Sequence, residues 1–221
     1  MVGYHTDRCP FCGASKDRFI TAEECSKNRK VLDKKVADSI YKMNSSPPFS
    51  LEHAAYFIKS NEIKIWIDCP STFDEKYIDI DYILFTHKHF LGAANIYQKY
   101  DSKLWMNKED IKGFYVKNQK FEKKIEGDFQ LNGIKAYHIN GHTDGFTFYI
   151  FKETIFICDY LFLKNNSLSF NPYGPSNLTK KGALKMKEII SSHQNELNNV
   201  CGFDYVLDFS DWIRKFEDLL S

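Results

Sequence analysis

Three histidines and one aspartate stand where apolar, strand-like runs of the sequence meet loops. These candidate metal ligands are His87, His89, His142 and Asp159. His87 and His89 are separated by one residue, so in extended backbone their side chains face the same side. Imidazole nitrogen and carboxylate oxygen are ligands that both Zn²⁺ and Fe²⁺ accept. We therefore predict that a rigid sheet holds these side chains around a divalent metal.

Short apolar runs separated by turns predict the elements that position these residues. Isoleucine, tyrosine, phenylalanine and tryptophan dominate runs of four or five residues, which is typical of strands. Asn132-Gly133 predicts a tight hairpin turn. The predicted strands are residues 54–58, 63–67, 82–85, 104–106, 129–131, 134–139, 146–151, 154–158 and 205–207. The predicted helices are residues 93–100, 178–197 and 211–220, and Ser210 is the predicted cap of the last helix.

Three motifs follow one another along the chain. They are His-x-His at residues 87–89, Gly-His-Thr-x-Gly at residues 141–145 and Asp-x-Leu-Phe at residues 159–162. From about residue 47 to the C-terminus, the sequence thereby resembles the metallo-β-lactamase-fold superfamily. The resemblance implies an α/β (α+β) fold, a four-layer αβ/βα sandwich. It also implies that His87, His89 and His142 form the first metal site, with Asp159 in the bridging position.

The segment after His89 departs from the pattern of that superfamily. The superfamily reads His-x-His-x-Asp-His-x-Gly, whereas this chain reads His87-Lys88-His89-Phe90-Leu91-Gly92. Either Leu91 and Gly92 replace the Asp-His pair, or the pair is deleted. We prefer the deletion, because Leu-Gly-Ala-Ala-Asn then begins the next helix. The pair supplies the second metal site of binuclear members, and the superfamily's final histidine is also not visible, so we expect a mononuclear site.

The resemblance also predicts roles for groups beside the metal. Asp68 falls where the superfamily has an aspartate at the end of its second strand, and we expect it to accept an N–H from a ligand histidine. Asp159 is expected to manage the proton of the reaction as well as to bind the metal. Tyr160 is expected to stabilise developing charge. The loop of residues 171–177 is expected to wall the substrate pocket through Tyr173.

A mononuclear site of this kind admits two chemistries. As a Lewis acid, the metal lowers the pKa of a bound water toward about 7, which enables hydrolysis of an ester or thioester. Iron with an open position would instead bind O₂ or a sulfur substrate, as in the persulfide dioxygenases that share this fold. We predict a metal-dependent hydrolase of a small-molecule ester or thioester. The alternatives are an iron-dependent oxidoreductase and a non-catalytic binding or scaffold protein.

Residues 1–44 differ in character from the rest and hold three of the six cysteines. The stretch Cys9-Pro10-Phe11-Cys12-Gly13 resembles the second knuckle of rubredoxins and of rubrerythrin-type iron modules, but the partner knuckle is absent. We predict a second zinc or iron site, with the ligands Cys9, Cys12, Cys25 and His5, and with Cys69 or His53 as other candidates. The alternative is a knuckle with free thiols. Ser/Pro-rich residues 44–50 predict the boundary to a metallo-β-lactamase-like domain at residues 45–221.

The composition bounds the class of protein. Lys and Arg number 30 and Asp and Glu number 29, so no charge excess favours a nucleic-acid partner. No apolar run approaches the ~18 residues needed to span a bilayer, and the N-terminus has no signal-peptide pattern. We therefore expect a cytoplasmic protein with a small-molecule substrate and no membrane partner. Its cysteines are then thiols or metal ligands, and its oligomeric state stays open.

Overall fold

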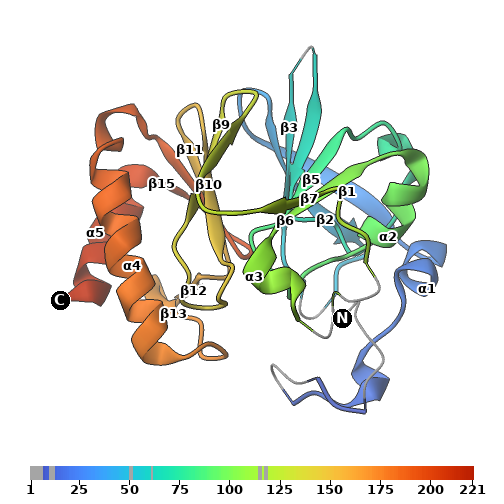
Figure 1. Cartoon of the computed structure of the whole chain (residues 1–221), viewed down its shortest axis with the longest axis horizontal. Coiled ribbons are helices and arrows are strands. Elements are labelled where there is room, and N and C mark those ends of the chain that lie inside the picture. Colours follow the sequence, from blue (N-terminus) through green and yellow to red (C-terminus); the bar gives the residue numbers. More distant parts are fainter. Residues whose placement is uncertain (1–6, 10–12, 50–51, 61, 114–115, 117–118) are drawn as a thin grey trace.

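Two β-sheets lie face to face, and helices cover the outer face of each sheet (Figure 1). This computed structural model describes residues 7–9, 13–49, 52–60, 62–113, 116 and 119–221. The layers follow one another as helices, sheet, sheet and helices across the molecule. The predicted α/β class and the αβ/βα sandwich are therefore confirmed.

The first sheet contains seven strands in the order of the sequence. The pairs among its first four strands are antiparallel, and the remaining pairs are parallel. The strands are β1 (Lys30–Ala37), β2 (Ile40–Ser46), β3 (Ala55–Lys59), β4 (Lys64–Ile67), β5 (Tyr82–Leu84), β6 (Lys103–Asn107) and β7 (Lys123–Ile125). The parallel strands β4 and β5 end on the same side, and the loop after β5 carries the His-x-His motif.

The second sheet contains six strands in the order β15-β14-β11-β10-β9-β8. Its strands are β8 (Phe129–Leu131), β9 (Ile134–His138), β10 (Thr147–Phe151), β11 (Thr154–Cys158), β14 (Asn199–Gly202) and β15 (Val206–Asp208). The predicted hairpin around Asn132-Gly133 is confirmed, because β8 and β9 pair antiparallel and both turn residues have positive φ angles. A separate hairpin consists of β12 (Leu161–Lys164) and β13 (Ser167–Phe170).

The helices fall into two groups on opposite outer faces (Figure 1). The two long helices, α4 (Ser176–Ser191) and α5 (Phe209–Leu220), cover the six-stranded sheet. The short helices α1 (Ala22–Lys27), α2 (Ala94–Tyr97) and α3 (Lys108–Ile111) contribute to the core on the other side. None of the helices in the described part of the chain has the length and apolar character needed to cross a bilayer.

Alternating side chains divide the interior into three apolar layers. In β4, Ile65 and Ile67 face the other sheet, whereas Trp66 faces the helices. In β11, Phe156 faces the other sheet, while Ile155 and Ile157 lie under α4 and α5. Because both faces of these strands are covered, each strand continues after its first residue as an unbroken apolar run instead of alternating with polar residues.

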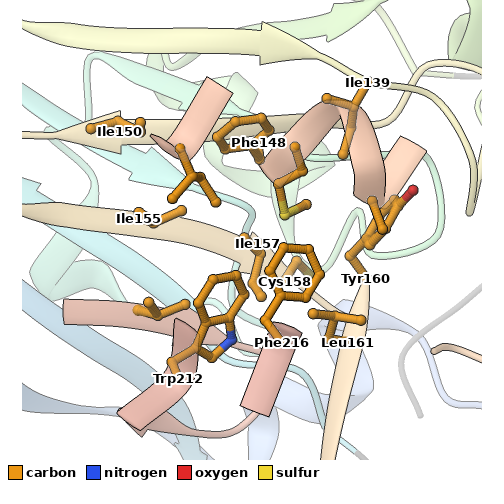
Figure 2. Packing of buried hydrophobic residues seen from close by; sticks show 14 of the residues in the cluster. Ile139, Phe148, Ile150, Ile155, Ile157, Cys158, Tyr160, Leu161, Trp212 and Phe216 are labelled. Carbon is orange, nitrogen blue, oxygen red and sulfur yellow. The ribbon is translucent and has the colours of Figure 1, made fainter. Parts of the chain in front are cut away.

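The layer under the long helices is rich in aromatic side chains. Trp212 and Phe216 of α5 stack with ring centroids 4.6 Å apart and lie against Ile155 and Ile157 (Figure 2). Both rings are fully buried. Burying one such side chain contributes about 1.5–3 kcal/mol to the free energy of folding, so this layer holds α5 firmly to the sheet.

Two sequence predictions differ from the structure at the ends of the sandwich domain. β1 and β2 pair with β3 inside the first sheet, so the predicted boundary after residue 44 falls within β2. The N-cap of the last helix is Asp208, whose carboxylate accepts a hydrogen bond from the Ser210 N–H, rather than Ser210 itself. The cap lies two residues earlier than predicted because the helix begins at Phe209.

Candidate metal centre

The structure brings the four predicted ligands together between the two sheets. His87 and His89 lie in the loop after β5, His142 lies between β9 and β10, and Asp159 directly follows β11. One ligand atom from each side chain can be chosen so that all lie within 4.8 Å of one another. His87 Nε2 is 3.3 Å from Asp159 Oδ1, His142 Nε2 is 3.5 Å from Asp159 Oδ2, and His89 Nδ1 is 3.0 Å from His142 Nε2.

Burial keeps the three imidazoles neutral. It is the largest influence on all three and lowers the pKa of His87 well below its usual value, that of His89 to about 2 and that of His142 to about 4. His142 and Lys88 lower the pKa of His89 further. Neutral imidazole carries the free lone pair that a metal ligand needs. Burial also raises the pKa of Asp159 well above its usual value, so a cation is the natural partner that would hold its charged form there.

Two atoms of this cluster fit a bound cation. His87 Nε2 and Asp159 Oδ1 are buried, and neither has a hydrogen-bond partner within the described residues. A buried polar atom without a partner costs about 1–3 kcal/mol, which coordination would offset. Three nitrogens and one carboxylate oxygen form a donor set that suits Zn²⁺ or Fe²⁺. The residues present therefore fit one divalent cation.

Asp68 contacts His87 through a hydroxyl group. Its carboxylate accepts hydrogen bonds from the Thr86 N–H at 2.9 Å and from the Thr86 Oγ1 hydroxyl at 2.8 Å. Thr86 Oγ1 lies 3.0 Å from His87 Nδ1. The predicted direct contact with a histidine is thus replaced by a relay, because Thr86 occupies the space between the two side chains. Since the Thr86 hydroxyl donates to Asp68, its oxygen is left to accept from His87 Nδ1, which directs Nε2 toward the cluster.

A buried carboxylate in α3 ties the two histidine loops to each other. Asp110 Oδ2 accepts from Thr143 Oγ1 at 2.7 Å and from the Lys88 N–H at 3.2 Å, while Oδ1 accepts from the Gly145 N–H at 3.1 Å. Lys88 Nζ lies 3.4 Å from Oδ1. Burial raises the pKa of Asp110, and the Thr143 hydroxyl, the Lys88 charge and the Gly145 amide oppose this rise. Lys88 separates His87 from His89 and Thr143 follows His142, so Asp110 fixes the register of both loops.

The loop after β13 closes the cluster on a third side. Asn171 Nδ2 donates to Asp159 Oδ2 at 2.8 Å and lies 3.3 Å from His142 Nε2. A Cβ at Gly174 would lie 2.9 Å from His142 Nδ1, so the backbone of this loop packs directly against the imidazole ring. Tyr173, the predicted pocket residue, is 54% exposed and available to a ligand approaching along this loop.

Known structures share this arrangement of sheets and helices. A crystal structure of VMB-1 matches with a TM-score of 0.71 and 16% identity, over 87% of this chain and 97% of that chain. The metallo-β-lactamase FIM-1 from Pseudomonas aeruginosa, in its mono-zinc form, matches with a TM-score of 0.68 and 11% identity, over 86% and 94%. The archaeal metallo-β-lactamase superfamily protein ST1585 from Sulfolobus tokodaii matches with a TM-score of 0.54 and 15% identity, over 76% and 80%. The chain has the metallo-β-lactamase fold. No family model and none of the curated proteins matches the sequence.

The segment after His89 is packed rather than open. The Phe90 ring stacks on His53 with centroids 4.1 Å apart. Gly92 has a φ of +53°, and a Cβ there would collide with the Cys69 carbonyl oxygen. Within the described ranges, His87, His89, His142 and Asp159 form the one group of three or more potential ligands that converges.

Tyr160 does not face the metal cluster. Its hydroxyl donates to the Thr179 carbonyl at 2.8 Å and lies 3.2 Å from the Asn140 carbonyl. Its ring belongs to the apolar layer under the long helices (Figure 2). The predicted stabilisation of developing charge by Tyr160 is therefore wrong, because the side chain next to Asp159 in the chain points to the other side. Tyr160 instead connects α4 to the turn that carries His142.

Two of the four residues of the predicted cysteine site lie outside the described part of the chain. His5 and Cys12 lie outside the described residues. Cys9 is partly exposed, whereas Cys25 is fully buried in α1, with Sγ 3.1 Å from Thr72 Oγ1. His53 Nε2 lies 3.1 Å from the Cys69 carbonyl oxygen, and both of these side chains are buried. Cys25, Cys69 and His53 thus have packing contacts inside the sandwich, and the cysteine site stays a prediction.

Three residues beside the cluster are not predicted from the sequence. Thr86 was within the strand-end stretch, but only its contacts distinguish it from other strand residues. Asn171 lies inside the loop that the sequence predicts as the pocket wall, and its amide carries no separate signal. Asp110 had no signal at all, because its partners Lys88, Thr143 and Gly145 are 22, 33 and 35 residues away.

Proposed function

We propose that this protein is a metal-dependent hydrolase that works with one divalent cation bound by His87, His89, His142 and Asp159. The observation that carries the proposal is the buried convergence of these four side chains, with His87 Nε2 and Asp159 Oδ1 lacking other partners among the described residues. The fold supports it, since the two sheets hold the ligand loops in fixed register.

A divalent cation bound there supplies Lewis acidity, which lowers the pKa of a water molecule toward about 7. The protein orients the ligands: Thr86 fixes the tautomer of His87, and Asp110 holds the loops of the three histidines. Asp159 is the one carboxylate of the cluster found among the described residues, so metal binding and proton transfer both fall to it.

A small-molecule ester or thioester is the proposed substrate. The near-equal numbers of basic and acidic residues support a small substrate over a nucleic acid. The single-metal centre is supported by the packed segment after His89, which brings no further ligand to the cluster. FIM-1, which shares the fold, has been solved in a mono-zinc form, so the fold accommodates one metal.

The test is the metal content of protein purified without added metal, combined with turnover of generic ester and thioester substrates. Wild-type protein is compared with His142→Ala, with Cys9→Ser/Cys12→Ser, and with His193→Ala as a matched control. His193 contacts Tyr137 outside the cluster, so this control should keep its metal. We expect His142→Ala to lose about one zinc per chain together with turnover. His193→Ala should keep both, and Cys9→Ser/Cys12→Ser should keep turnover.

Other results would redirect the proposal. Iron in the wild-type protein, with a coloured or redox-active centre and no ester turnover, would replace the hydrolase by the iron oxidoreductase. Metal that is lost only in the cysteine variant would leave the four-residue cluster without a cation. The proposal of a hydrolase would then be replaced by that of a non-catalytic binding or scaffold protein.

A further inference from the structure

We propose that Asn171 holds one oxygen of Asp159, so that this carboxylate offers a single oxygen, Oδ1, to the cation. This inference rests on the proposed metal site and adds the group that sets its coordination. Asn171 is a positioning residue in this role, because it acts on the cation through Asp159. Its side chain comes from the loop between β13 and α4, and only 3% of the residue is exposed.

The orientation of the Asn171 amide is fixed by its neighbours. Asn171 Oδ1 accepts a hydrogen bond from the Tyr173 N–H at 2.9 Å. A backbone N–H needs an acceptor, so the oxygen of the amide must face Tyr173 and the nitrogen must face Asp159. The reverse orientation would place two donors together at Tyr173 and two acceptors together at Asp159.

Both hydrogens of the amide nitrogen have acceptors on Asp159. Asn171 Nδ2 is 2.8 Å from Asp159 Oδ2 and 3.0 Å from the Asp159 backbone carbonyl oxygen. His142 Nε2 is farther away at 3.3 Å, so Asp159 is the nearer partner of the amide. The two carboxylate oxygens of Asp159 therefore differ: Oδ2 accepts from an amide, whereas Oδ1 is buried without a hydrogen-bond partner in the described structure.

This difference sets how Asp159 can bind. An amide hydrogen bond to Oδ2 competes with coordination of that oxygen, which disfavours both two-oxygen binding and a bridge to a second cation. Three histidine nitrogens and Oδ1 then give four protein donors, which leaves room for substrate or water. A rigid amide in a buried loop performs this task without adding charge to the site.

The experiment uses Co²⁺ as the probe, because its visible absorption is strong in four- and five-coordinate sites and weak in six-coordinate ones. Metal-free wild-type protein and three variants are titrated with Co²⁺ and followed by absorption and by metal content. Asn171→Leu keeps most of the volume and removes the amide. Asn171→Asp keeps the oxygen that serves Tyr173 and replaces the donor with a carboxylate oxygen, which also adds a negative charge beside Asp159. Asn198→Ala is the matched control, since that amide donates to Glu153 on the surface.

We expect the absorption per bound Co²⁺ to fall about twofold or more in Asn171→Leu and Asn171→Asp, because Oδ2 becomes free to bind the cation. The Co²⁺ affinity should fall about 10-fold or more in Asn171→Leu, as for other losses of a group that orients a ligand. Asn198→Ala should match the wild type in both. The Asn171→Asp arm keeps the test valid if Asn171→Leu fails to fold.

Two failures can be told apart. Wild-type protein that binds Co²⁺ strongly, with the same spectrum in Asn171→Asp, overturns the role of Asn171 and leaves the proposed function intact. Wild-type protein that binds no Co²⁺ overturns the proposed function, and the inference falls with it.

Discussion

Replacing Asp110 with alanine should destabilise the whole fold. Asp110 hydrogen-bonds to neighbours of the candidate ligands in the chain, and not to the imidazole rings themselves. The substitution removes the acceptor for the Thr143 hydroxyl and for the N–H groups of Lys88 and Gly145, at 2.7, 3.2 and 3.1 Å. Each of these hydrogen bonds contributes about 1 kcal/mol net. Asp110 is fully buried, so water does not readily replace the lost acceptor.

The sum is a loss of about 3 kcal/mol in the free energy of unfolding. For a protein of this length, about 1 kcal/mol lowers the melting temperature by about 2–4 °C, so we expect a decrease of about 6–12 °C. Urea unfolding of metal-free protein, followed by circular dichroism, measures the change in free energy directly.

The matched control is Asp128→Ala. Asp128 also accepts a backbone N–H, that of His138 at 2.8 Å, but it is exposed to solvent. Water can replace that acceptor, so this variant should lose less than about 1 kcal/mol. A loss below about 1 kcal/mol in Asp110→Ala as well would refute the argument that Asp110 holds the two loops.

Three further substitutions test other parts of the structure. Thr86→Val removes the hydroxyl between Asp68 and His87 and should weaken metal binding about 10-fold or more, measured by calorimetric titration; unchanged affinity would contradict the relay. Gly182→Ala places a Cβ against the Tyr160 hydroxyl and should cost about 1–3 kcal/mol in urea unfolding, so neutral behaviour would count against the close approach of α4. Trp212→Ala empties a fully buried site and should cost about 3–5 kcal/mol in the same assay, and a much smaller loss would show that α5 is not held by this layer.

The sequence alone was sufficient to predict the ligands and most strands. Strand ends and turns are determined by a few neighbouring residues. Asn132-Gly133 is an example, because the predicted hairpin of β8 and β9 is present there. His87 and His89 follow an apolar run closely, as do His142 and Asp159, and all four side chains converge in the structure, although the backbone at residues 86–89 is a bend and turn and not extended. These signals lie in neighbouring residues, so they can be recognised without knowledge of the tertiary contacts.

The strands β1 and β2 show where such local signals fail. The Ser/Pro-rich stretch after them reads as a domain boundary, yet both strands pair into the sheet next to β3. The hairpin of β12 and β13 was also not predicted, although its turn residues Asn165 and Asn166 both adopt positive φ angles. Whether a segment joins a sheet depends on which partner strand is available to pair with it. The β-propensity of the segment alone does not predict that partner.

Only the tertiary structure decided what surrounds the ligands. Tyr160 follows Asp159 directly in the turn after β11, yet its hydroxyl contacts the Thr179 and Asn140 carbonyls and not the cluster. Asp110 and Asn171 reach the cluster from distant elements, and their partners were settled by the packing of α3 and of the loop before α4. The sequence by itself determined which side chains can bind a metal, because ligand chemistry belongs to single residues. The structure determined how those side chains are oriented, because orientation comes from contacts between segments that the chain order keeps apart.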